Sequence, residues 1–283
     1  CWWLEALHDR LCADVFASDH LFADDTPVPV LDPGRGRTRT GRLWVNAREQ
    51  RGWGGPAPPA AVYLFAPDRK AERPLAHLER FKGVLHVDGY AGFERLTAKG
   101  DIVLAACWAH TRRKFYDVHQ QTGSPVAEEA LRRIADLYAV EAKAWRRSLS
   151  APHLAAFKLW LEAQLAQIPR SSTLADAIRY ALARWAGLNR FLDDGRIELD
   201  TNPVERAIRP VALGRKNHLF AGSDGGGHRW AVICSLIETA KLNKVEPYAW
   251  LSDVLTRMID GHPANRIDEL LPWNWALSQR ADA

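Results

Sequence analysis

Residues 20–49 read HLFADDTPVPVLDPGRGRTRTGRLWVNARE and predict a β-hairpin. Residues 20–31 form a strand-like run, residues 32–36 (DPGRG) supply a turn, and the segment after the turn is rich in Thr, Leu, Trp and Val. The tip of this hairpin is basic, because it carries four arginines: Arg35, Arg37, Arg39 and Arg42. These side chains are either phosphate contacts or parts of a solvated turn.

The chain after the hairpin alternates between strands and helices. Three apolar runs each predict a buried strand, namely AVYLFAP (61–67), VLHVDGY (84–90) and IVLAACWAH (102–110). Helical patterns at about 74–82 and 91–99 separate these runs. Alternation of this kind after an antiparallel start predicts an α/β fold whose sheet mixes strand directions.

Residues 126–190 change character, because apolar residues recur at helical spacing in three consecutive amphipathic stretches. We expect an all-helical insertion there. A short helix from Pro203, a Gly-rich loop at 222–227 and long helices at about 228–243 and 247–260 are predicted to follow.

Composition and charge exclude some classes of protein. The 283 residues carry a formal net charge of +4, which is too small to identify a partner. No CxxC pair occurs among Cys1, Cys12, Cys107 and Cys234, which argues against a zinc site or a disulfide framework and favours a reducing cytoplasm. The chain has neither an apolar run of about 18 residues nor a basic-then-apolar leader, so we expect no membrane span and no signal peptide. Because residue 1 is Cys and not Met, we expect an upstream segment.

Three positions hold acids that a metal site could use. Side chains alternate along a strand, so Asp24 and Asp25 cannot both point into one site. Asp88 ends a buried strand before a glycine and is either a site acid or a turn acid. Glu205 follows a potential helix cap at Asn202 and is either catalytic or a capping-box glutamate.

Basic clusters lie close to these acids in the sequence. The segment CWAHTRRKF (107–115) and the segment VERAIRPVALGRKN (204–217) together supply Arg112, Arg113, Lys114, Arg206, Arg209, Arg215 and Lys216. Such clusters bind a nucleic-acid backbone without reading its sequence. The alternative is a solvated helix face with intrahelical pairs such as Glu205 with Arg209. The segment GSDGGGH (222–228) lacks the Lys-Ser/Thr of a P-loop, so it does not predict nucleotide binding.

Three carboxylates beside cationic side chains suit phosphodiester chemistry. Two divalent ions about 3.5–4 Å apart activate the attacking oxygen and stabilise the leaving one. Hard oxygen ligands without clustered Cys or His favour Mg²⁺ or Mn²⁺ over zinc. A glycosidase that uses two of the acids is the alternative, but it leaves the basic clusters unexplained.

Several motifs follow one another along the chain: ADDTPVPVLDPGRGRTRTGRLWV, LHVDGYAGF, CWAHTRRKF, the long block TNPVERAIRPVALGRKNHLFAGSDGGGHRWAVICSLIETAKLN, and DELLPWNW. Taken in order, they resemble the motifs of the insertion sequence 66 (IS66) family of DDE transposases. The resemblance implies an RNase H-like fold, with a mixed five-stranded sheet flanked by helices and an all-α insertion before the last catalytic acid. It also implies that Asp24 (in preference to Asp25), Asp88 and Glu205 are the catalytic acids and hold two Mg²⁺ or Mn²⁺ ions.

The resemblance further implies what the protein does and where. We expect metal-dependent strand cleavage at insertion-sequence ends and strand transfer into target DNA, by a homo-oligomer in the bacterial cytoplasm at the nucleoid, with accessory proteins of the same element as possible partners. Full-length relatives carry an upstream segment that binds the element's ends, and these 283 residues hold none. The alternative is therefore a truncated, inactive remnant that still binds DNA.

The expected domain organisation follows the same motifs. It comprises a lead-in helix (1–18), the first part of the catalytic core (19–125), the helical insertion (126–195), the second part of the core with the Glu-bearing helix (196–245), and a C-terminal helical segment with a Trp-rich tail (246–283).

Overall fold

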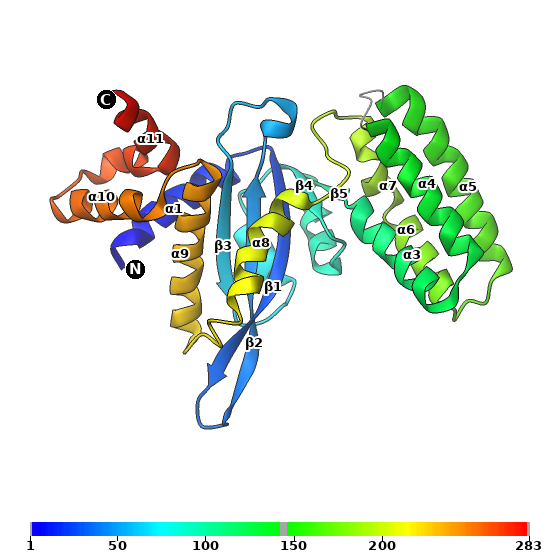
Figure 1. Cartoon of the computed structure of the whole chain (residues 1–283), viewed down its shortest axis with the longest axis horizontal. Coiled ribbons are helices and arrows are strands. Elements are labelled where there is room, and N and C mark those ends of the chain that lie inside the picture. The colour runs from blue at the N-terminus through cyan, green and yellow to red at the C-terminus, as the bar shows by residue number, and fades with distance from the viewer. Residues whose placement is uncertain (1, 142–145, 282–283) are drawn as a thin grey trace. The chain divides into compact units, whose positions relative to one another are not determined.

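A computed structural model describes residues 2–141 and 146–281, which fall into two units (Figure 1). The first unit contains the described residues up to Leu85, Ala91–Val103, and those from Asn202 onward. The second contains His86–Tyr90 and Leu104–Thr201. Cys1 lies outside the described residues.

The sheet has five strands in the order β3-β2-β1-β4-β5. Their bounds are β1 (His20–Asp32), β2 (Arg37–Arg48), β3 (Ala60–Ala66), β4 (Gly83–Val87) and β5 (Ile102–Ala106). The first three strands are antiparallel, with Asp24 opposite Val45 and Val45 opposite Tyr63. The predicted hairpin is therefore confirmed. So is the predicted α/β fold, in which helices flank a mixed five-stranded sheet of the RNase H-like kind.

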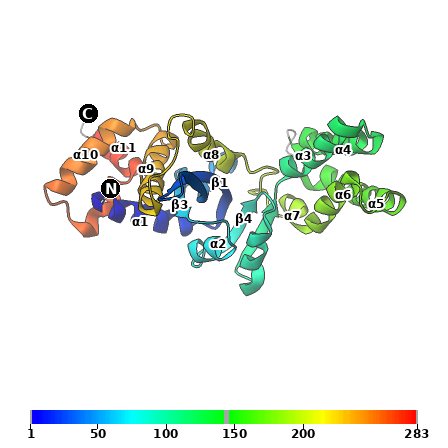
Figure 2. The same ribbon diagram turned by 90° about the horizontal axis from the view of Figure 1, so that it is seen from below.

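One face of β1, β2 and β3 contributes to a hydrophobic core of the first unit. Alternate residues along β1, such as Phe22, Val28 and Val30, are buried on this face. Helices α8 (Asn202–Gly214) and α9 (Asp224–Leu242) pack against it. Figure 2 shows α8 on one side of the sheet and the short helix α2 (Glu72–His77) on the other.

Helix α9 also runs along the edge strand β3 (Figure 1). The Ser235 hydroxyl accepts from the Tyr63 amide at 2.8 Å, and the Thr239 hydroxyl accepts from the Ala61 amide at 3.1 Å. Four residues of helix and two residues of strand both rise about 6–7 Å, so the two hydroxyls match two successive outward-facing backbone groups of β3. These bonds satisfy backbone groups at the edge of the sheet that could otherwise pair with a strand of another chain.

The loop predicted at 222–227 is shorter than expected, because only residues 222 and 223 lie outside a helix. Helix α9 begins at Asp224, and the hydroxyl of Ser223 caps it by accepting from the Gly226 amide at 3.1 Å. The reason for glycine lies in packing, because a Cβ on Gly227 would stand 2.5 Å from the ring of Phe65. A Cβ on Gly225 would meet only the Ser223 hydroxyl, at 3.7 Å.

A Gly227→Ala substitution is therefore expected to destabilise the fold by about 1–3 kcal/mol through overpacking against Phe65. The matched variant Gly225→Ala should be neutral or stabilise the fold by up to about 1 kcal/mol, because alanine favours a helix. Urea unfolding of both variants measures the difference. Equal stabilities would contradict the packing explanation.

The second unit is mostly helical, as predicted for the insertion. It contains α3 (Trp108–Thr122), α4 (Pro125–Glu141), α5 (Ala151–Gln167), α6 (Thr173–Ala183) and α7 (Trp185–Asn189), with a π-helical turn at Arg146–Ser150. Trp108, Phe157 and Trp185 form its aromatic core, with ring centroids 5.8–6.3 Å apart. The predicted strand at 102–110 is too long, because β5 ends at Ala106 and α3 begins at Trp108.

The remaining elements of the first unit are helical. They are α1 (Trp2–Phe16), α10 (Pro247–Ile259), α11 (Pro272–Ala281) and 3-10 helices at Arg51–Trp53, Ala91–Lys99 and Ala264–Leu270; a further 3-10 turn, Arg190–Leu192, lies in the second unit. Trp250 of α10 is fully buried and donates to the Leu270 carbonyl at 3.0 Å. None of the described helices combines the length and hydropathy that a membrane span requires.

Candidate active site

The two neighbouring aspartates of β1 have different environments. The Asp25 side chain is 0% exposed and lies between two guanidinium groups, with Arg42 Nη1 at 2.9 Å and Arg69 Nε at 2.8 Å. Asp24 is half-buried on the opposite face of the sheet, and its Oδ1 accepts from the Asp25 amide at 2.7 Å. The Asp25 carboxylate is therefore fully buried in an ion-pair network, whereas Asp24 is only partly buried.

The face of the sheet that carries Asp24 is the face that α8 covers. Phe22 and Val28, which flank Asp24 along this face, belong to the same core as Val204 of α8. Glu205 follows Val204 in the first turn of α8 and is exposed. The positive end of the helix dipole favours an ionised carboxylate at that position.

Asp88 belongs to the second unit and lies directly after β4. Its side chain is half-buried, and its Oδ1 accepts from the Tyr90 amide at 2.9 Å. Tyr180 of α6 and Arg184, the residue that follows α6, bind the backbone of this loop. Tyr180 Oη donates to the Asp88 carbonyl at 2.5 Å, and Arg184 Nη2 donates to the Gly89 carbonyl at 2.8 Å.

Sequence reasoning did not single out Tyr180 or Arg184. Tyr180 lies 92 residues beyond Asp88 in a helix whose apolar spacing indicates only packing. The dipeptide Asp88-Gly89 was the one local signal, because Gly89 has a φ of +107°, a conformation that suits glycine.

The basic segment that follows β5 lies on helix α3. The chain turns at Cys107, and the amide of Ala109 donates to Asp200 Oδ1 at 3.0 Å at the start of α3. Phe115 of α3 is buried, whereas Arg112, Arg113 and Lys114 are exposed. All three cations are thus available at the surface of the second unit.

The second basic segment belongs to α8 and the turn after it. Arg206, Arg209 and Lys216 are exposed. Arg215 is half-buried and donates to the hydroxyl of Thr26, two residues along β1 from Asp24. Arg215 therefore contacts the strand that carries the first acid.

Three arginines of the hairpin have partners within the first unit. Arg39 pairs with Asp224 at the start of α9, and Arg42 pairs with Asp25. Arg35 Nε lies 3.7 Å from Asp32. These contacts favour a structural role for Arg35, Arg39 and Arg42 over phosphate binding.

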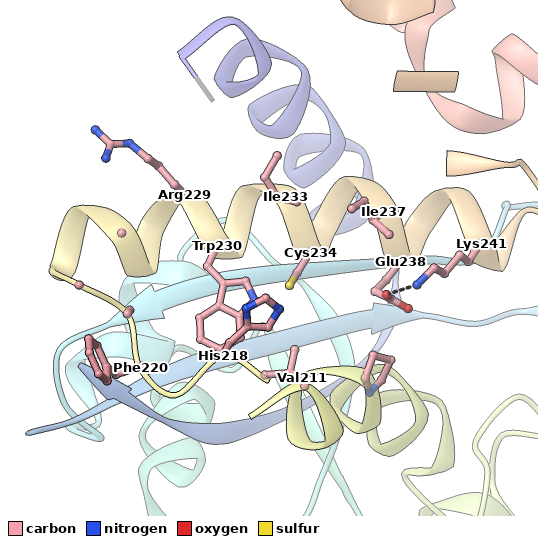
Figure 3. Close-up of a pocket in the computed structure, with 15 residues that line it drawn as sticks. Val211, His218, Phe220, Arg229, Trp230, Ile233, Cys234, Ile237, Glu238 and Lys241 are labelled. Atoms are coloured by element: carbon pink, nitrogen blue, oxygen red, sulfur yellow. Dashed lines mark hydrogen bonds and ion pairs between the residues drawn. The ribbon is translucent and has the colours of Figure 1, made fainter. Parts of the chain in front are cut away.

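An apolar cavity of about 610 Å³ lies between α8, α9 and the loop that joins them (Figure 3). Trp230 and His218 face each other there, with ring centroids 5.8 Å apart, and Lys241 pairs with Glu238 at 2.8 Å. Burial raises the pKa of Cys234 in its wall to about 12, so this thiol stays protonated at neutral pH. The three candidate acids are not among the described residues that line the cavity.

Comparison with known proteins gives two family matches. The model described as Transposase IS66 family matches residues 1–229, and the IS66 C-terminal element matches residues 235–273.

Similar curated proteins come from Sinorhizobium fredii, and each is described as uncharacterized. Protein y4jD is 44% identical over 299 residues, covering 100% of this chain and 58% of the relative. Protein y4qI is 42% identical over 290 residues, covering 96% of this chain and 54% of the relative. Protein y4hP is 40% identical over 304 residues, covering 98% of this chain and 54% of the relative. The chain spans somewhat more than half the length of these relatives. The resemblance that the motifs indicated is confirmed, and the chain belongs to the IS66 family of transposases.

Proposed function

We propose that this chain carries the catalytic core of a DDE transposase that cleaves DNA at insertion-sequence ends and joins the resulting 3′-hydroxyl to target DNA. Asp24, Asp88 and Glu205 would be its catalytic acids. The observation that carries the proposal is the contrast between two neighbouring residues of β1. Asp25 is paired with two arginines, whereas Asp24 lies on the face of the sheet that α8 covers. Membership of the family supports the same assignment.

The proposed ligands fit a hard divalent cation. All three are carboxylates, the donors that Mg²⁺ and Mn²⁺ prefer. Asp24 and Asp88 are half-buried and Glu205 is exposed, so none of them is sealed in the core. Two bound ions would supply activation of the attacking oxygen and stabilisation of the leaving oxygen.

We assign DNA backbone contacts to the exposed cations on α3 and α8 and to the turn after α8. They are Arg112, Arg113, Lys114, Arg206, Arg209 and Lys216, together with Arg215. These contacts would position the duplex without reading its sequence. Action on two DNA ends favours a homo-oligomer at the bacterial nucleoid, with accessory proteins of the same element as further partners.

A metal-dependence assay tests the proposal. The full chain is incubated with DNA that carries the element's inverted repeats, in Mg²⁺, in Mn²⁺ and in EDTA. We expect 3′-hydroxyl nicks and strand-transfer products only with metal, and recovery of both when Mg²⁺ replaces EDTA. Cleavage that persists in EDTA would contradict the metal mechanism, and DNA binding without cleavage in either metal would identify a DNA-binding remnant.

A further inference from the structure

We propose that Tyr180 and Arg184, at the carboxyl-terminal end of α6, are positioning residues that hold the Asp88 loop in its metal-binding conformation. The inference rests on the proposed function, because it assigns a supporting role at the same site. It also gives the helical insertion a supporting role at the site.

The first observation is a pair of hydrogen bonds to adjacent peptide groups. Tyr180 and Arg184 are four residues apart and therefore reach the loop from the same side of the helix. Tyr180 Oη donates to the Asp88 carbonyl at 2.5 Å, and Arg184 Nη2 donates to the Gly89 carbonyl at 2.8 Å. With Oδ1 of Asp88 held by the Tyr90 amide, both the backbone and the side chain of Asp88 have fixed partners.

The second observation is that the loop and α6 fit only with glycine at position 89. A Cβ on Gly89 would lie 2.5 Å from both Tyr180 Oη and Arg184 Nε. The φ of +107° at Gly89 is also strained for any other residue. Glycine therefore allows the close approach that the two hydrogen bonds require.

The third observation concerns the state of the two side chains. The Arg184 guanidinium lies 4.0 Å from the centroid of the Tyr180 ring, so each orders the other. The Nζ of Lys114, a proposed DNA contact, lies 5.5 Å from the centroid of the same Tyr180 ring.

The fully buried face of α6 does not include these two residues. Its buried face consists of Ala175, Ala177, Ile178 and Ala181, whereas Tyr180 and Arg184 are half-buried. Removing the polar contacts should therefore change the loop more than the helix. This separates a positioning role from a structural one.

The test measures Mn²⁺ binding by calorimetry without DNA, and cleavage of the inverted-repeat DNA, in the full chain. Tyr180→Phe removes one oxygen atom, and Arg184→Ala removes the second donor. Loss of a supporting contact around a metal ligand typically costs about 10- to 100-fold, so we expect Mn²⁺ affinity and kcat to fall by about tenfold or more in each variant. The KM for DNA and the melting temperature should stay near those of the wild type.

Two matched variants and one reference complete the experiment. Tyr248→Phe alters an exposed tyrosine of α10. Arg179→Ala removes a partly exposed arginine of α6 that pairs with Asp176 and donates to the Arg170 carbonyl, away from the Asp88 loop. Both variants should keep wild-type Mn²⁺ affinity and cleavage. Asp88→Asn should lose Mn²⁺ binding. If it does while Tyr180→Phe and Arg184→Ala bind normally, the positioning role is wrong and the metal site stands. If Asp88→Asn binds Mn²⁺ as the wild type does, both proposals fail.

Discussion

An Asp24→Asn variant is expected to lose Mg²⁺-dependent cleavage and strand transfer by on the order of a thousandfold, the scale on which a single electrostatic group in an active site acts. The substitution keeps the shape of the side chain and removes its charge, so a metal ligand is lost while the strand is preserved. Asp24 is half-buried, and its Oδ1 accepts from the Asp25 amide, a bond that the asparagine oxygen retains. Melting temperature and DNA affinity should therefore change little.

The neighbouring variant Asp25→Asn is the matched control. Its carboxylate is fully buried between Arg42 and Arg69, so loss of the charge leaves two cations without their counterion. Because both arginines are partly exposed, we expect a cost of about 2–3 kcal/mol, at or below the low end for breaking a buried pair. Activity per folded molecule should persist. Urea unfolding and the cleavage assay measure the two effects, and the reverse pattern would assign the metal ligand to Asp25.

These two aspartates show which features of the site can be predicted from the sequence and which cannot. Strand alternation requires Asp24 and Asp25 to lie on opposite faces, and the hairpin register places Arg42 diagonally across from Asp25 on one face. Local pattern could supply both facts. Arg69 belongs to the connection after β3, where no periodicity fixes its position, so the second partner of Asp25 required the structure.

The strands, the helical insertion and the family could be predicted from the sequence, because each leaves a periodic pattern or a motif. The residues that support Asp88 could not be predicted, since Tyr180 and Arg184 contact its loop across more than 90 residues of sequence. Helix α9 begins at Asp224, earlier than the predicted start at about residue 228, for a related reason. Its glycines indicate a loop by propensity, but Ser223 caps a helix there and Gly227 is required by close packing against Phe65.

The continuation of α8 is a further case in which tertiary packing overrides a local signal. Pro210 lies inside the helix, where proline removes one backbone hydrogen bond. The helix nevertheless runs to Gly214, and its residues Val204, Ala207 and Val211 are buried against the sheet. Burial of this stripe offsets the cost of the proline and keeps Glu205 at the start of a long helix.

Glu205→Gln is the second variant with a large expected effect. If Glu205 is a metal ligand, cleavage and strand transfer should fall by on the order of a hundredfold or more, because a preorganised charge in the active site is removed. Glu205 is exposed, so the melting temperature should change little. If Glu205 is instead only a helix cap, the same variant should lose stability and keep its activity.

Glu246 provides the matched control, because it is a capping glutamate in this same chain. Its carboxylate accepts from the amides of Tyr248 at 3.1 Å and Ala249 at 2.6 Å at the start of α10. These bonds lower the pKa of Glu246 below 4.5, so its stabilisation is present at neutral pH and is lost as the pH falls below that ordinary value. Glu246→Gln should therefore lower the melting temperature at pH 7, with a smaller difference from wild type in acid, and leave cleavage unchanged. A Glu205→Gln variant that follows the Glu246→Gln pattern would remove Glu205 from the active site.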